Sequence, residues 1–300
     1  MIEHHYANAT MNTASRADVS RLAADDITFD EALGWRTQRA TLVLWPGGQA
    51  IYVGMGQSVA LHRHYATQIS IGLGTPLQVR TRASGPCTEQ QSFIVGPNRE
   101  HQVEMTGVPS FVLWSEARAL ADLARRLSST SASELPALPE GLLSVLLPIL
   151  LASFGQVPDE QAGHALRSHV LTQLLGPTWD EGTGDPRIAT ARSLVTPQLL
   201  ALQPQPITHL AALVYLSPSR FRHLFRREMG MSVQSYLRWQ RLLAALRTSA
   251  YGASLTEAAH AAGFADSAHL TRVCRATFGI APSLIFKHSH AVQVIPGTGS

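Results

Sequence analysis

The stretch SPSRFRHLFRREMGMSVQSYLRWQR, residues 217–241, combines many arginines with an apolar spacing that is typical of a buried helix face. Phe221, Leu224 and Phe225 stand at positions i, i+3 and i+4, so they share one face of a helix. The serine and proline that open the stretch suit the N-cap and the first helical position. The pattern therefore predicts a helix that begins here, with an apolar face and a basic face.

The segments around this helix predict a helix-turn-helix that occurs twice. ITHLAALVYLS, residues 207–217, indicates a short amphipathic helix and a tight turn before the basic helix. SLTEAAHAAGF and ADSAHLTRVCRATFG, residues 254–279, repeat the same order, with Leu270, Val273 and Cys274 on the buried face. The intervening residues, 230–250, read as one long helix that could act as a rod. Two such basic helices can enter successive major grooves, about 34 Å apart, on one face of DNA.

The charge distribution supports this interpretation. The chain has 24 Lys+Arg and 21 Asp+Glu, a net charge of +3. Residues 186–300 hold 12 Lys+Arg and 3 Asp+Glu, a net charge of +9, whereas residues 1–185 carry a net charge of −6. A basic domain joined to an acidic one is typical of nucleic-acid binding, although a basic patch can also be a solvated face.

The residues from about 206 to 282 closely resemble the DNA-binding domain of AraC/XylS-type transcription regulators. The matching stretches are LAALVYLSPSRFRHLFRREMGMSVQSYLRWQRL and LTEAAHAAGFADSAHLTR, followed by FGIAP. Cys274 stands where this family usually has an aromatic residue, and Ile285-Phe286 stand where Tyr-Arg is common. The resemblance implies an effector-responsive, sequence-specific regulator that binds a double-stranded DNA operator and, as an activator, would also contact RNA polymerase.

The resemblance also implies which side chains meet DNA. Phosphate contacts outnumber base contacts in such complexes, so Arg226 and Arg275 are as well explained by phosphate binding as by base reading. Arg222 and Arg272 are favoured as base readers, and Ala268 offers only a thymine-methyl contact. The full predicted DNA-binding set is Ser219, Arg220, Arg222, His223, Arg226, Ala268, Thr271, Arg272 and Arg275.

The amino-terminal half predicts a different architecture. From Thr41 to Val112, short apolar runs alternate with Gly and Pro, which is the signature of many short strands in a barrel or sandwich. His62 and His64, followed by His101, resemble the two motifs of a cupin barrel. In metal-binding cupins such histidines and a carboxylate hold the ion, and Gln68 stands where the carboxylate would be. Three neutral imidazoles can still hold zinc or another divalent ion.

Two alternatives remain for this half of the chain. A barrel without metal would use its interior for a small organic effector, and the aromatic residues Trp45, Tyr52, Tyr65 and Trp114 are the candidate ligand-binding side chains. Each of these four is equally well explained as ordinary core.

The histidines alone support a rival function, a cupin-type metal-dependent enzyme fused to a DNA-binding domain. A constitutive architectural DNA binder is a third alternative, which a steep salt dependence without operator preference would favour.

Helical spacing follows the strands. Leu120, Leu123, Ala124 and Leu127 share one face, which could pack on the chain's own barrel or pair two protomers, and we expect a homodimer. GPTWDEGTGDP, residues 176–186, is rich in turn formers and reads as a linker.

The predicted fold class is two-domain α+β. The expected domains are a flexible tail at 1–25, a cupin-like effector-binding and dimerisation domain at 26–175, a linker at 176–186, a double helix-turn-helix domain at 187–288 and a flexible tail at 289–300. No continuous apolar segment near Met1 resembles a signal peptide, no run spans a membrane, and only two cysteines occur, which suits the cytoplasm. No catalytic triad or P-loop spacing is visible, so an enzyme is not expected.

Overall fold

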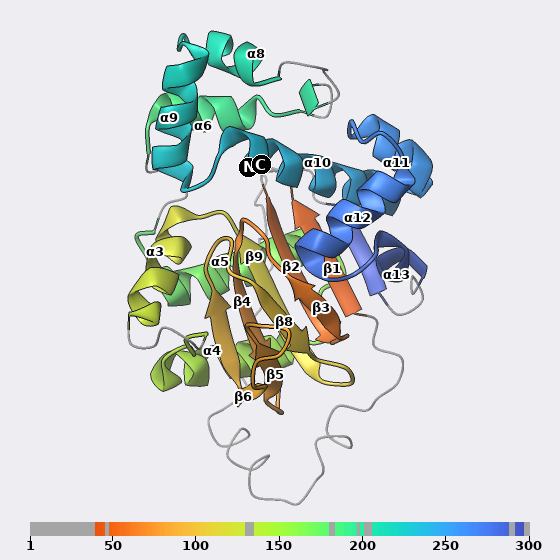
Figure 1. The fold of residues 1–300 in the computed structure, drawn as a ribbon. Coiled ribbons are helices and arrows are strands. Elements are labelled where there is room, and N and C mark those ends of the chain that lie inside the picture. The colour runs from red at the N-terminus through yellow and green to blue at the C-terminus, as the bar shows by residue number, and fades with distance from the viewer. Residues whose placement is uncertain are drawn as a thin grey trace, which may run out of the picture. The chain divides into compact units, whose positions relative to one another are not determined.

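Short strands fill the first part of the chain and helices dominate the second (Figure 1). The computed structural model describes residues 40–45, 48–129, 135–179, 184–196, 199–200, 206–287 and 292–296. They all belong to one unit, Gln38–Ser300. The tail expected at 1–25 lies outside the described residues. We call residues 40–175 the sheet module and residues 186–287, where the sequence predicts the two helix-turn-helix units, the reader module. This arrangement confirms the two-part α+β architecture.

The larger sheet has six strands in the order β10-β1-β2-β9-β4-β7. Its strands are β1 Ala40–Trp45, β2 Gln49–Met55, β4 Thr67–Gly72, β7 Ser92–Val95, β9 Pro109–Ser115 and β10 Val292–Pro296. Every residue of β1, β4 and β7 is buried, as expected for short apolar runs that are covered on both faces.

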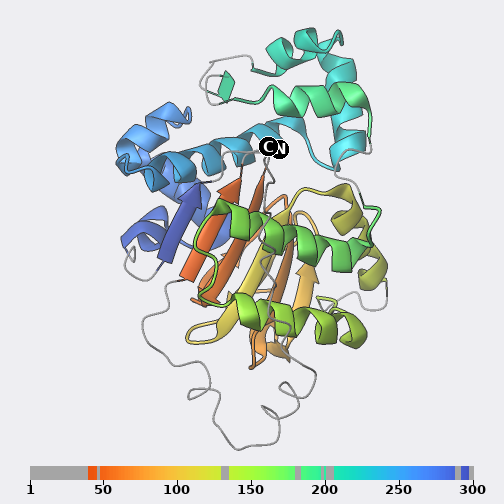
Figure 2. The same cartoon turned by 180° about the vertical axis from the view of Figure 1, so that it is seen from behind.

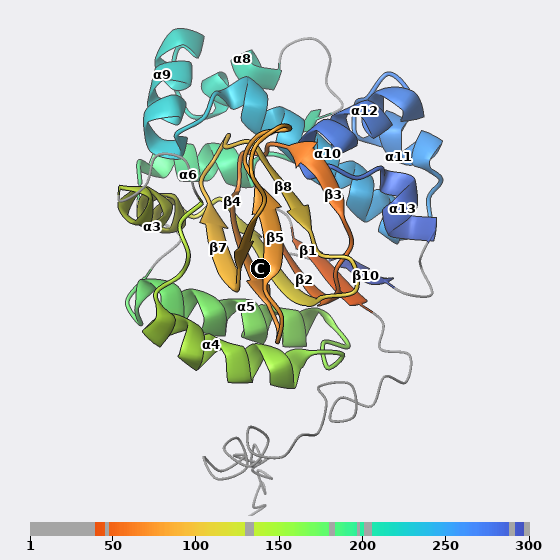
Figure 3. The ribbon, with the colours of Figure 1, turned by 60° about the horizontal axis from the view of Figure 1, so that its bottom comes forward.

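A smaller sheet contains β3 Val59–His62, β8 His101–Glu104, β5 Leu77–Arg80 and β6 Thr88–Gln90, in the order β3-β8-β5-β6 (Figure 3). Burial alternates along β5, so one face of this sheet is packed and the other is more exposed. Among the described strands neither sheet closes on itself, because β3 and β6 remain edge strands of the smaller sheet and β7 and β10 of the larger one. The predicted closed barrel is therefore not seen, and the strands form two sheets.

Helices α3 Arg118–Ser128, α4 Glu140–Ser153 and α5 Glu160–Leu175 follow the strands. Figure 2 shows α4 and α5 lying across the larger sheet. Leu146 and Leu150 of α4 and Val170 of α5 join Val43 and Ile69 of the sheet in one apolar core. Among the described residues, no helix, the leucine-rich α4 included, combines the length and apolar character needed to span a membrane.

The apolar face of α3 packs on the chain's own core. Leu120 and Ala124 are fully buried in that core, and Leu123 and Leu127 pack against it partly buried. The spacing allowed this face either to pack on the chain's own strands or to pair two protomers. In the structure it packs on the chain's own core. Leu120 and Ala124 are therefore not available to a partner helix, and the expected homodimer stays a prediction.

The reader module consists of helices. They are α6 Pro186–Ser193, α8 Pro206–Leu213, α9 Pro218–Met229, α10 Val233–Ala250, α11 Leu255–Ala261, α12 Ser267–Phe278 and α13 Pro282–Lys287. Phe221 and Phe225 of α9 pack with Tyr236 in one core, while Leu270 and Cys274 of α12 lie in another. Long helix α10 contributes to both cores. In Figure 1, α9 lies near one end of α10, and α11 and α12 lie near the other.

The segment after residue 288 departs from the expected flexible tail. Val292–Pro296 forms β10, which pairs in parallel with β1 at the edge of the larger sheet. The sequence VQVIP is rich in β-branched residues, which favour strands. The edge of β1 also offers backbone groups that need partners, and β10 supplies them. The remaining residues of the expected tail lie outside the described part of the chain.

The reader module shares an apolar core with the sheet module. Trp239 and Leu242 of α10 lie in the same buried cluster as Leu42 and Leu44 of β1. Backbone hydrogen bonds add a second tie, since the N–H of Ala60 donates to the carbonyl of Gly279 over 3.1 Å, next to the end of α12. A change in the sheet module can therefore reach the reader helices through packed atoms.

A buried carboxyl group lies at this contact. Glu116 follows β9, and its side chain is 0% exposed. Its Oε1 accepts a hydrogen bond of 3.2 Å from Gln240 of α10, and its Oε2 lies 3.7 Å from the guanidinium of Arg192. Burial outweighs the attraction of Arg192 and raises the pKa of Glu116 to about 8. Gly48, at φ 87°, gives it room, because a Cβ there would collide with the carboxyl group.

This pKa predicts a pH-dependent stability. In the unfolded chain Glu116 ionises near its ordinary value, whereas the folded chain holds the proton up to about pH 8. The free energy of unfolding should therefore fall as pH rises from about 5 to 8. Glu116→Gln should remove this part of the slope and be more stable than wild type at pH 8 by about 1 kcal/mol or more.

Urea denaturation at several pH values measures the effect. Glu140→Gln, an exposed carboxylate on α4, is the matched control and should leave the slope unchanged. Identical pH dependence for wild type and Glu116→Gln would show that this carboxyl group is not held neutral.

Candidate functional site

The first predicted reading helix, α9, begins where the sequence predicts. The Oγ of Ser217 accepts a hydrogen bond of 3.3 Å from the N–H of Arg220, and Pro218 is the first helical residue. Gly230 ends the helix in the left-handed conformation, at φ 70°, which glycine adopts without steric cost. Phe221, Leu224 and Phe225 are buried, as predicted. The helix is therefore anchored through one face only.

The second predicted reading helix, α12, follows the same plan. The carboxylate of Asp266 caps it by accepting a hydrogen bond of 2.6 Å from the N–H of His269. Leu270 and Cys274 are buried as predicted, whereas Val273 is only partly buried. Cys274 stands where an aromatic residue is usual in the family, and here it fills a site against α10 in the shared core.

Nearly all of the predicted DNA-binding side chains point to solvent. The exposed ones are Ser219, Arg220, Arg222, His223 and Arg226 on α9, and Ala268, Arg272 and Arg275 on α12. Thr271 is the exception: it is partly buried, and its hydroxyl donates to the carbonyl of Ser267 over 2.8 Å. Since α10 has 18 residues, it is about 27 Å long, which suits a spacer between two grooves.

A small apolar cavity of about 120 Å³ lies between the sheets and the end of the reader module. The sheet module contributes Tyr52 and Trp114, two of the predicted ligand-binding residues, together with His62 and Gln68. The reader module contributes apolar residues, and these are Leu246, Phe278, Ile280, Leu284 and Ile285. The cavity has polar groups only on the side of the sheets.

Two predicted ligand-binding residues do not line this cavity. Trp45 is buried in the core below α5, where the guanidinium of Arg167 lies 5.2 Å from its ring centroid. Tyr65 is partly buried beside the reader module and lines a different, polar cleft. The position of Trp45 fits the alternative reading as ordinary core.

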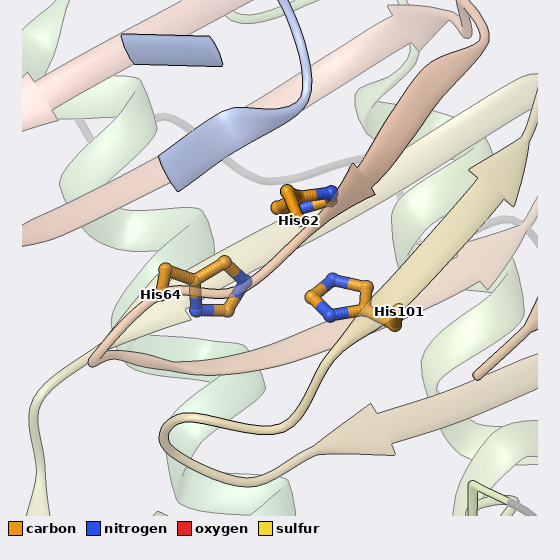
Figure 4. Close-up of side chains that lie close together, drawn as sticks. All are labelled: His62, His64 and His101. Carbon is orange, nitrogen blue, oxygen red and sulfur yellow. The ribbon is translucent and has the colours of Figure 1, made fainter. Parts of the chain in front are cut away.

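The three predicted histidines come together (Figure 4). His62 ends β3, His101 begins β8 directly opposite it, and His64 follows β3 in the next turn. All three are buried, and one ring nitrogen from each lies within 4.8 Å of the others. The ring centroids of His62 and His101 are 4.2 Å apart. Burial is the main cause that lowers the pKa of each ring, so the rings are neutral at pH 7.

Each ring has a backbone carbonyl within hydrogen-bond distance of its Nδ1. The Nδ1 of His62 lies 2.8 Å from the carbonyl of Ala60, the Nδ1 of His64 2.8 Å from that of Ala66, and the Nδ1 of His101 3.1 Å from that of Arg99. For His62 the carbonyl is the hydrogen-bond partner of the ring, so Nδ1 carries the proton and Nε2 keeps its lone pair. His64 and His101 also have the amide oxygen of Gln68 near Nε2, so in these two rings either nitrogen can be the donor. This backbone support is typical of metal-ligating histidines.

Gln68 adds a fourth lone-pair donor to the same space. Its Oε1 accepts a hydrogen bond of 2.8 Å from the indole of Trp114, and its Nε2 donates to Ser70 over 2.9 Å. These partners fix the amide orientation. The same Oε1 then lies 2.7 Å from the Nε2 of His64 and 3.3 Å from that of His101. A neutral ring donates to one of its two oxygen partners and keeps a lone pair on the other nitrogen.

The chemistry of this donor set fits a divalent ion of the zinc class. Zinc takes imidazole nitrogen at about 2.1 Å, and a tetrahedral arrangement then places nitrogens about 3.4 Å apart. The histidine nitrogens lie within 4.8 Å of one another, so small ring movements would bring them to that spacing. The amide oxygen of Gln68 would complete a set of four neutral ligands.

Sequence reasoning missed three features of these sites. In the sequence, Gln68 replaces the carboxylate expected in a metal motif. In the structure, its Oε1 lies within hydrogen-bond distance of His64, His101 and Trp114. The departure at Ile285 has a local reason, because this side chain lines the cavity. Glu116 carries no local signal at all, since only the fold brings it to Gln240.

A family model agrees with the helix-turn-helix units of the carboxyl-terminal region. Residues 210–288 match the profile of a helix-turn-helix domain, and curated protein sequences gave no match. One similar solved structure is a ToxT point variant from Vibrio cholerae without ligand. The two sequences are 11% identical, the alignment covers 79% of this chain and 95% of that chain, and the TM-score is 0.48.

Two further solved structures are similar. Wild-type ToxT from the same organism, bound to an unsaturated fatty acid, has 11% identity over 79% of this chain and 94% of that chain, with a TM-score of 0.45. A transcriptional regulator with an AraC-type DNA-binding domain from Chromobacterium violaceum has 24% identity over 35% of this chain and 93% of that chain, with a TM-score of 0.31. The carboxyl-terminal region of this chain, residues 210–288, matches a helix-turn-helix domain.

Proposed function

We propose that this chain is an effector-responsive transcription regulator that binds a specific DNA operator. The observation that carries the proposal is the pair of capped helices, α9 and α12, which anchor one face in a core and present arginines outward near the two ends of α10. Such helices fit successive major grooves. The net charge of +9 after residue 185 attracts the DNA backbone to the same module.

Within this proposal the arginines have two roles. Arg222 and Arg272 lie in the first half of their helices, as base-reading residues of a recognition helix do. Arg226 and Arg275 lie one turn later and bind phosphates. Only the first pair carries sequence information, since phosphate contacts position the protein on any duplex.

Replacement of Arg222 tests these roles. Arg222→Ala should cost about 1 to 3 kcal/mol of binding free energy on the preferred operator and relax the preference at one base position. Arg226→Ala is the matched control on the same helix, and it should weaken binding to operator and random DNA equally. An operator is first selected from random DNA with the full chain, and affinities are then measured by fluorescence anisotropy. Equal losses on both duplexes for Arg222→Ala would make it a phosphate contact.

The apolar cavity is the proposed effector site. Its walls suit a small apolar molecule that carries one polar group to meet Gln68 or Tyr52. Because α10, α12 and α13 supply the rest of the lining, a ligand there would press directly on the second reading unit. If the ligand bound one arrangement of α12 more tightly than another, effector binding would change the affinity of the chain for DNA.

A divalent cation at the histidine cluster is a separate proposal, supported by three buried imidazoles whose ring nitrogens lie within 4.8 Å of one another beside Gln68. His62, His64 and His101 would hold the ion, and Gln68 would be the fourth ligand. Such an ion would anchor β3 to β8. Metal-dependent turnover, the rival function, has the same histidines as its only support, and a screen for turnover with added iron, manganese or zinc separates the two.

Zinc titration tests the cation site. By calorimetry, the wild-type chain should bind one zinc ion, and His101→Ala should bind at least tenfold more weakly. Gln68→Glu should bind zinc more tightly because it adds a negative ligand. His169→Ala, an exposed histidine on α5, is the control and should bind as wild type does. Equal zinc binding by His101→Ala and wild type would exclude this site.

A homodimer would use the outer face of α4. Val145 is 46% exposed there, and residues 141–153 contain no charged side chain. A second copy could cover this face, because apolar surface without charge is typical of interface cores.

Sedimentation velocity tests the dimer. The wild type should sediment as a dimer at micromolar concentration, and Val145→Glu should shift it to a monomer. Ala165→Glu, at an exposed position on α5, is the control and should remain dimeric. A monomeric wild type, with and without DNA, would contradict the homodimer.

A further inference from the structure

A polar cleft of about 960 Å³ opens between the two helix-turn-helix units. It is separate from the apolar cavity and from the histidine cluster. Its lining contains four arginines and a histidine but no carboxylate, and these basic residues are Arg63, Arg222, Arg238, Arg241 and His269. They come from the sheet module, from α9, from α10 and from α12. A cleft of one charge sign concentrates the field of its charges and attracts ions of the opposite sign.

Arg63 is the unexpected member, because it belongs to the sheet module. It follows β3 directly, and its side chain is exposed. Its backbone N–H donates to the carbonyl of Ala276 on α12 over 3.4 Å. This bond, together with that between Ala60 and Gly279, holds the end of β3 against α12. The position of Arg63 is thus set by the reader module.

The cleft arginines repel one another. Arg238 and Arg241 are one turn apart on α10, and burial together with the charge of Arg238 lowers the pKa of Arg241. Described carboxylates form ion pairs with Arg118, Arg125, Arg187, Arg192 and Arg227 instead. Within the described part of the chain, no carboxylate pairs with the four cleft arginines. Like charges held together in this way are relieved by a bound anion.

We propose that this cleft binds the sugar-phosphate backbone of DNA between the two grooves read by α9 and α12, and that Arg63 makes the sheet module part of the DNA interface. The proposal rests on the proposed function, since it needs both reading helices on one duplex. Arg222 on α9 and His269 on α12 border the cleft, so a duplex that meets both helices passes its mouth.

The sign of the charge argues for contact rather than obstruction. If the sheet module kept DNA away from the reader module, we would expect it to present carboxylates to the reading helices. Such carboxylates would take the place of the DNA phosphates. It presents Arg63 instead, although residues 1–185 carry a net charge of −6. Arginine suits phosphate because its planar guanidinium makes two parallel hydrogen bonds to the oxygens. Sequence-independent affinity, rather than base reading, is its expected contribution.

Salt-dependent DNA binding tests this assignment with the full chain. The probes are a duplex selected from random DNA for binding to the wild type and a scrambled duplex of the same length. Arg63→Ala and Arg238→Ala should each lose affinity several-fold and by the same factor on both duplexes. The slope of log K against log salt should fall by about 0.9 for each, as expected for one lost phosphate contact. Arg82→Ala, an exposed arginine elsewhere on the sheet module, should bind as wild type does.

The outcomes separate this proposal from the proposed function. If the wild type prefers its selected duplex but Arg63→Ala and Arg238→Ala keep the full affinity and slope, the cleft proposal is overturned and the regulator stands. Loss for Arg238→Ala alone would overturn the role of the sheet module. Thermal stabilisation of the wild type, but not of Arg63→Ala, by inorganic pyrophosphate, with unchanged DNA binding, would assign the cleft to a small anion. A wild type without sequence preference would instead contradict the proposed function.

Discussion

The burial of α10 against β1 is the interaction on which the rest of this structure depends. Trp239 and Leu242 lie in one apolar cluster with Leu42 and Leu44, so a helix of the reader module completes the core of the sheet module. Densely packed cores do not deform continuously but switch between discrete arrangements. A ligand that changes the sheets therefore has a physical route to the reading helices, and DNA has the same route back.

Three further contacts join the sheet module to the reader module. They are backbone hydrogen bonds, a buried carboxyl group and an ion pair, and different changes would weaken each of them. Backbone hydrogen bonds hold β3 to the end of α12, and these respond to any shift of β3. The buried carboxyl group of Glu116 accepts a hydrogen bond from Gln240 of α10. Ionisation of this carboxyl group would weaken the tie, because its burial favours the neutral form. A partly exposed ion pair of 3.7 Å joins Arg118 to Glu228 near the end of α9, and such pairs contribute little in water. The tie at β3 is closest to the histidines, the apolar cavity and Arg63.

The sequence predicted the reader module more fully than the sheet module, and the reason is physical. Caps, turns and helical spacing are local signals, so the N-cap Ser217 and the buried face of α9 could be located from neighbouring residues alone. Strand pairing is not local. The split into two sheets, the return of β10 to β1 and the burial of the α3 face depend on which surfaces meet. Glu116 and Arg63 acquire their roles only through contacts with distant residues.

The central claim is that α9 and α12 read two successive major grooves on one side of a duplex. Hydroxyl-radical footprinting of the selected duplex with the full chain measures this directly. The account predicts protected patches for each bound copy that repeat after about 10 base pairs and lie on a single face of the helix. A single protected half-turn, or patches on opposite faces, would contradict the account.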